Sequence, residues 1–210
     1  MNIHQLKDIT RNSTLATISQ QMNAIEKHSL NHTPWITHPY KPSVRFSIAH
    51  SNDCIFLKFF VTEKSIRSVN TEVNGPVYED SCVEFFISFH NDKAYYNLEF
   101  NCTGTCLAGF GEGRNDRQLL PLEVINKIRS QSVINRDAAE KNIEWELVLE
   151  IPLSFFCHHT LDSLTGSAGR ANFYKCGDLL PEPHYVTWSN IEAPAPNFHL
   201  PAFFGRLEFV

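Results

Sequence analysis

The sequence predicts an all-β protein, a two-sheet antiparallel β-sandwich with one peripheral N-terminal helix. From residue 44 onward, about ten short segments either alternate apolar and polar side chains or are apolar throughout, as β-strands do. No helical pattern alternates with these segments, so a parallel α/β sheet is not expected. The chain has 210 residues, 42% of them hydrophobic and 16 of them Phe, which is enough for the core of one large sandwich.

Residues 1–43 are expected to form a helix and an extended connector that pack on the sandwich of residues 44–210. The helix is predicted over residues 13–28, with a polar cap at position 12 or 13. The apolar side chains that recur there at helical steps are Leu15, Ile18, Met22 and Ile25. Residues 31–42 contain three prolines and Trp35, which is typical of an extended connector anchored by its aromatic side chains.

A β-hairpin is predicted from residues 82–89 and 94–101, with a polar turn at 90–93. The side chains on its predicted core face include Phe85, Ile87, Leu98 and Phe100. A turn centred near positions 91 and 92 places Glu84 opposite Glu99, and cross-strand partners of this kind lie only about 5 Å apart.

The other face of this hairpin has an unusual composition. It carries the carboxylates of Glu84 and Glu99, the aromatic ring of Phe86 and the amide of Asn97, where a solvent-exposed face would carry Lys, Thr and Ser. Either this face is a binding surface or another segment of the chain covers it.

The other strands follow from the same alternation and are expected at residues 44–50, 54–61, 130–134, 143–151, 171–176, 185–188 and 206–210. Residues 189–205 contain three prolines and predict an ordered loop without regular structure. The glycine-rich stretch 104–113 lacks both the GxGxxG spacing and a following helix, so we interpret it as the end of a hairpin rather than a phosphate loop.

Charge and cysteine content exclude several classes of function. A net charge of −5 without a Lys/Arg cluster argues against a nucleic-acid partner, and no apolar run approaches the ~20 residues of a membrane helix. The first residues lack the apolar core of a signal peptide, so with Met1 as the natural start we expect a cytoplasmic protein, and otherwise a secreted one. The six cysteines lie mostly beside apolar residues in strand-like segments, which predicts reduced thiols. The sequence gives no indication of the oligomeric state.

The order of these segments resembles the family 9 carbohydrate-binding modules and their stand-alone bacterial relatives. The segments that carry the resemblance are VYEDSCVEFFI (77–87), YYNLEFNCTGT (95–105), WELVLEIPLSFF (145–156), ANFYKCGD (171–178) and TWSNIEAPAPNFHLPAFFGRLEF (187–209). The resemblance implies a sandwich that holds a sugar between two aromatic rings while acidic and amide side chains bind its hydroxyls. It is similar to modules attached to xylanases, which bind the reducing ends of plant polysaccharides.

By position in these motifs, the resemblance implies a ligand site of Tyr78, Glu84, Asn97 and Trp188. Trp188 and Glu84 match the family in kind, whereas Tyr78 replaces a tryptophan and Asn97 replaces an arginine. Aromatic rings suit the apolar face of a sugar, and carboxylates and amides suit its hydroxyls. The expected function is therefore non-catalytic binding of a saccharide or oligosaccharide. No cofactor is expected, although loop residues such as Asp80 leave structural calcium open.

Three other functions remain open from the sequence. Glu84 and Glu99 suit the two carboxyl groups of a glycosidase, which a retaining enzyme holds about 5 Å apart. A haem-binding sandwich would need axial ligands, and the methionines, Met1 and Met22, lie outside the predicted strands. The third alternative is a structural or partner-binding sandwich that does not bind sugar.

Overall fold

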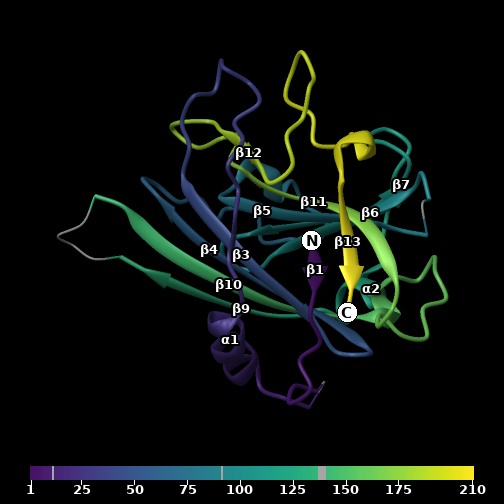
Figure 1. Cartoon of the computed structure of the whole chain (residues 1–210). Helices are drawn as coiled ribbons and strands as arrows, with labels where there is room; N and C mark the ends of the chain where they lie inside the picture. The colour runs from purple at the N-terminus through teal and green to yellow at the C-terminus, as the bar shows by residue number, and fades with distance from the viewer. Residues whose placement is uncertain (11, 91, 137–140) are drawn as a thin grey trace.

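Two β-sheets packed face to face form the body of the protein (Figure 1). The computed structural model describes residues 1–10, 12–90, 92–136 and 141–210. The larger sheet follows the order β1 (Asn2–Ile3), β13 (Gly205–Phe209), β11 (Ala168–Cys176), β5 (Cys82–Phe89), β6 (Tyr95–Asn101), β7 (Cys106–Gly111) and β8 (Gln118–Leu119), with β12 (Tyr185–Thr187) paired to β11. The smaller sheet follows the order β2 (His28–Ser29), β3 (Ser43–His50), β4 (Cys54–Glu63), β10 (Ile143–Pro152) and β9 (Arg129–Asn135). The predicted all-β sandwich is confirmed.

The β5–β6 hairpin has the predicted register. Glu84 pairs with Glu99, and Phe86 pairs with Asn97. The four side chains predicted for the core face, Phe85, Ile87, Leu98 and Phe100, all lie in the core between the sheets. Position 91 of the predicted turn lies outside the described residues.

The predicted N-terminal helix is present as α1 (Leu15–Ala24) and is shorter than the 13–28 expected. Thr14 caps it, because its Oγ1 accepts a hydrogen bond of 3.1 Å from the backbone N–H of Thr17. The helix ends at Ala24, because the backbone of Ile25 is extended, and the chain then continues into β2. The other helical segments are short: α2 (Leu122–Ile125) and the 3-10 turns η1 (Val77–Glu79), η2 (Leu153–Phe155) and η3 (Pro201–Phe203).

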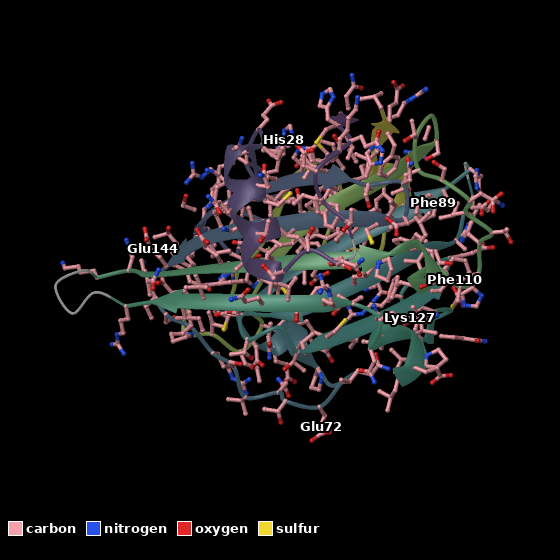
Figure 2. All side chains as sticks on the ribbon, turned by 90° about the horizontal axis from the view of Figure 1, so that it is seen from below. His28, Glu72, Phe89, Phe110, Lys127 and Glu144 are labelled. Atoms are coloured by element: carbon pink, nitrogen blue, oxygen red, sulfur yellow. The ribbon has the colours of Figure 1, made fainter. Side chains whose placement is uncertain are left out.

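Helix α1 covers the outer face of the smaller sheet, as the view from below shows (Figure 2). Its buried residues Ile18 and Met22 share a cluster with Phe56 of β4 and Val148 of β10. Among the described residues, no helix is long and apolar enough to cross a membrane.

The segment predicted to pack on the sandwich from outside also contributes strands to both sheets. β1 pairs in parallel with β13, and β2 pairs with the start of β3. Each of these strands has two residues, so neither carries a periodic pattern that the sequence could reveal.

The central strands of the larger sheet are covered on both faces. Every residue of β5 and β6 is buried, including those on the face that points away from the smaller sheet. The segment between β12 and β13 lies over that outer face (Figure 1), where Phe198 and Phe204 join Phe86, Tyr95 and Tyr174 in a second apolar cluster. Trp35 anchors the connector here by donating a hydrogen bond of 3.0 Å to the carbonyl oxygen of Ala193.

A buried ion pair joins the two sheets. The Lys175 Nζ of β11 lies 2.9 Å from Oε2 of Glu63 on β4, and both side chains are fully buried. Trp145 Nε1 donates to the other Glu63 oxygen at 2.7 Å, and Lys175 also donates to Nε2 of His184 at 2.8 Å. Burial and the neighbouring Lys175 lower the pKa of His184 to about 3, so its imidazole is neutral.

Removing the cation of this pair should destabilise the fold strongly. Lys175→Met should lower the free energy of unfolding by about 3–5 kcal/mol, because the Glu63 carboxylate stays buried without its partner. Adding Glu63→Gln should recover most of this loss, since glutamine is neutral and still accepts the Trp145 hydrogen bond. Urea denaturation followed by tryptophan fluorescence measures both variants. An equal loss in the single and double variants would contradict this account of the ion pair.

Candidate functional site

A pocket of about 510 Å³ opens on the outer face of the larger sheet. Its floor is made by Glu84 of β5, Glu99 of β6 and Cys176 of β11, three adjacent strands. Successive side chains of a strand point to opposite faces, so Glu84 points outward because Val83 and Phe85 point into the core. The walls include Tyr78 of η1 and Tyr185 of β12, together with the loop residues Arg114, Arg117, Asp178, Asn197, Phe198 and His199.

The two carboxyl groups of the floor have different partners. Glu99 Oε1 accepts hydrogen bonds from Arg117 Nη1 at 3.0 Å and Asn97 Nδ2 at 3.1 Å. Glu84 Oε1 accepts one from the Cys176 thiol at 3.2 Å. Burial raises the pKa of both carboxyl groups, the Glu99 charge raises that of Glu84 further, and Arg117 opposes the rise at Glu99. Glu84 therefore holds a proton more readily than Glu99 does.

Arg117 is held over the floor by a chain of hydrogen bonds. Its Nη1 donates to Nε2 of His199 at 2.8 Å, and Nδ1 of His199 lies 2.8 Å from the Tyr95 hydroxyl. Burial and the charges of Arg117 and Arg114 lower the pKa of His199 to about 3. The ring is therefore neutral, with Nε2 as acceptor and the proton on Nδ1.

Aromatic rings make up part of the wall. Phe198 stacks on the buried Tyr174 at 4.2 Å with an interplanar angle of 7°, so its position is fixed. Tyr185 meets Phe198 at 6.0 Å and Trp35 at 6.0 Å, both edge to face. The hydroxyl of Tyr185 also donates a hydrogen bond to the carboxylate of Asp178. Burial raises the pKa of Asp178, and this hydrogen bond opposes the rise. The pocket thus offers apolar rings with hydrogen-bonding groups beside them.

Asp80 fixes the loop that brings Tyr78 to the pocket. Its carboxylate is fully buried, pairs with Arg67, and accepts hydrogen bonds from the backbone N–H groups of Val69 at 3.1 Å and Asn70 at 2.9 Å. Burial alone would raise the pKa of Asp80, but these donors lower it overall. Protein groups therefore already neutralise the carboxylate that the sequence singled out for calcium.

The structure brings two of the four predicted ligand residues into the pocket. Tyr78 and Glu84 line it. Asn97 is fully buried and does not line it, although it donates to Glu99 and so helps to orient that carboxylate. An arginine does reach the floor, but it is Arg117 from the loop before β8 rather than a residue of β6.

The prediction that Trp188 lines the pocket needs correction. Trp188 packs edge to face against Phe173 at 5.6 Å and Phe46 at 6.3 Å, next to the core between the sheets. A Cβ atom at Gly205 would lie 2.5 Å from its ring, so glycine is needed there. The residues Tyr185 and Trp188 are three positions apart and thus point to opposite faces, and Tyr185 faces the pocket.

Sequence reasoning missed Arg117, Asp178, Phe198 and His199. All four lie outside the regular strands, where no periodicity predicts which way a side chain points. The sequence did contain a signal for Tyr185. Successive side chains of residues 185–188 point to opposite faces, so Tyr185 and Trp188 lie on opposite faces.

Comparison with models of protein families decides to which family the chain belongs. The family model for carbohydrate-binding family 9 matches residues 15–209. The chain belongs to carbohydrate-binding family 9. This membership confirms the resemblance that the sequence motifs indicated, and carbohydrate-binding family 9 is a family of binding modules.

Several solved structures share the architecture of this chain. A candidate carbohydrate-binding protein of Bacteroides uniformis ATCC 8492 is 39% identical, with a TM-score of 0.92, and the match covers 100% of this chain and 98% of that one. A family 9 module of Caldicellulosiruptor kristjanssonii in complex with glucose is 12% identical, with a TM-score of 0.61 and coverage of 100% and 95%. A family 9 module from the same organism in complex with cellotriose is 10% identical, with a TM-score of 0.66 and coverage of 100% and 92%. Among curated proteins, the comparison gives no significant match.

The raised pKa of Glu84 predicts a pH-dependent gain of stability in Glu84→Gln. The folded-state pKa lies above the ordinary value of 4.5, so the folded protein binds a proton that the unfolded chain releases. The wild type therefore loses stability as pH rises from about 4.5 through the folded-state pKa. Glutamine mimics the protonated acid, so the variant should be more stable than the wild type at about pH 7, and the difference should vanish below about pH 4.

Urea denaturation at a series of pH values measures this difference in the free energy of unfolding. Glu79→Gln, on the nearby turn η1, is a matched control, because Glu79 does not line the pocket. A Glu84→Gln variant that is less stable than wild type at neutral pH would show that the protein stabilises the charged carboxylate instead.

Proposed function

We propose that this pocket binds a saccharide without changing it chemically. The sugar lies with its apolar face against the rings of Tyr78 and Tyr185, and its hydroxyls bond to Glu84, Glu99 and Arg117. One observation carries the proposal: a single pocket has aromatic walls and a floor of buried, fixed hydrogen-bonding groups.

The floor suits hydroxyl recognition for a physical reason. Each sugar hydroxyl is both donor and acceptor, so it is satisfied by a group that accepts beside one that donates. Glu99 accepts, Arg117 donates, and a protonated Glu84 does both. Because the two carboxyl groups are buried and all three groups are already hydrogen-bonded, they lose little freedom when a ligand binds.

The size of the pocket supports a small ligand. Its volume of about 510 Å³ lies within the range of about 300–1,000 Å³ of pockets that take small molecules. Two structures from the same family contain glucose and cellotriose, which supports glucose and its oligosaccharides as the first ligands to test.

The absence of catalysis is part of this proposal. Glu84 and Glu99 are direct cross-strand neighbours on one floor, whereas the two carboxyl groups of a glycosidase flank the bond that is cleaved. Arg117 and Asn97 also donate hydrogen bonds to one oxygen of Glu99, the carboxylate that would act as nucleophile. Incubation with aryl glycosides of glucose, xylose and galactose should release no phenol, and Glu84-dependent release would overturn this part of the proposal.

Removing a wall ring should weaken binding. Tyr78→Ala and Tyr185→Ala should each raise the Kd by roughly tenfold, because an aromatic–sugar contact worth about 1.4 kcal/mol corresponds to that factor. Isothermal titration calorimetry with glucose, xylose, galactose, their disaccharides and cellotriose measures the Kd.

Phe110→Ala is the matched control, since Phe110 is a partly buried aromatic side chain outside the pocket. It should leave the Kd unchanged. If the sugar still binds to Tyr78→Ala and Tyr185→Ala but no longer binds to Phe110→Ala, its site lies outside the proposed pocket. Failure of wild type to bind any saccharide would favour a structural or partner-binding role.

A further inference from the structure

Two thiols and one carboxyl group meet at the floor of the pocket. Cys82 of β5 and Cys176 of β11 are direct cross-strand partners. Glu84 is two residues along β5 from Cys82, so its side chain projects from the same face. The ligand atoms of Cys82, Glu84 and Cys176 all lie within 4.8 Å of one another, and all three side chains are buried.

This donor set is selective. Thiolate sulfur prefers soft and borderline metals, and a carboxylate oxygen completes sites of Zn²⁺ in many proteins. Hard cations such as Ca²⁺ and Mg²⁺ take six or more oxygen ligands, which two thiols exclude. Three protein ligands also leave one position of a tetrahedral ion open.

We propose that Cys82, Glu84 and Cys176 form a binding site for a thiophilic divalent cation, with Zn²⁺ as its occupant. Glu84 and Cys176 line the pocket, whereas Cys82 lies behind them. An ion thus enters from the pocket, and its fourth position faces the pocket, where water supplies the remaining ligand. The site does not rest on the proposed sugar binding, because its three ligands are set by strand register.

The charges around the floor favour a cation at this point. Among the described residues, Arg117 is the cation that pairs with Glu99, and Glu84 forms no ion pair with a basic side chain. A metal ion binds the deprotonated forms of Cys82, Cys176 and Glu84. When the ion binds, each of these groups releases its proton to solvent as its sulfur or oxygen becomes a ligand.

Titration of the reduced, chelator-treated full chain with Zn²⁺ or Co²⁺ alone, without any saccharide, tests the proposal. Calorimetry with Zn²⁺ should give one ion per chain. Co²⁺ should produce the visible bands of a tetrahedral ion and an ultraviolet sulfur-to-metal charge-transfer band. Zinc bound to two thiolates should show sulfur neighbours at about 2.3 Å by X-ray absorption.

Variants assign the ligands. Cys82→Ala, Cys176→Ala and Glu84→Gln should each weaken Zn²⁺ binding at least about tenfold, since each removes one of three protein ligands. Two matched controls should leave binding unchanged: Cys106→Ala, a buried thiol of β7 outside the trio, and Cys157→Ser, an exposed thiol. Circular dichroism confirms that each variant is folded, and Zn²⁺ should raise the Tm of wild type and controls but not of the ligand variants.

Wild-type protein that gives no charge-transfer band overturns the proposal, even if the cysteine variants fail to fold. Equal Zn²⁺ affinity in the trio variants and the controls overturns it as well. Because no sugar is present, a negative result here leaves the proposed saccharide binding to its own calorimetric test.

Discussion

The covering of the larger sheet on both faces at β5 and β6 is the constraint on which the site depends. A sheet with one face in water would leave the outward side chains of β5 and β6 solvated and mobile. Here the connector and the segment between β12 and β13 bury them (Figure 1). Polar groups buried in this way must find partners in the protein. The hydrogen bonds among Glu99, Arg117 and His199 meet that requirement, and they also fix the groups that a ligand would touch.

Buried charges also fix the strands and the loop that surround the pocket. The pair Lys175–Glu63 ties β11 to β4 on the core side of the sheet, one residue before Cys176 on the floor. Asp80 ties down the loop that carries Tyr78 on the other side of the pocket. Each of these charges is stable in the interior because it is paired and hydrogen-bonded to other groups of the protein.

The fold was largely predictable, and the site only in part. Strict alternation predicted the β5–β6 hairpin, the pairing of Glu84 with Glu99 and the outward face of both. Alternation with a period of two identifies which side chains share a face, but not what covers that face. The sequence therefore did not show which segment covers Phe86. The sequence also placed Trp188 at the pocket, whereas Tyr185 is the residue that lines it. Loop residues such as Arg117 and His199 have no periodicity, and only the packed structure brings them to the floor.

The most direct test of this account is a crystal structure of the protein with bound cellotriose or glucose. The account predicts electron density for a sugar ring against Tyr78 and Tyr185, with hydroxyls in hydrogen-bonding distance of Glu84, Glu99 or Arg117. Trp188 should make no contact with the sugar. A sugar bound instead at Trp188, or in the groove beside Phe110 and His158 with the Tyr78 pocket empty, would contradict it.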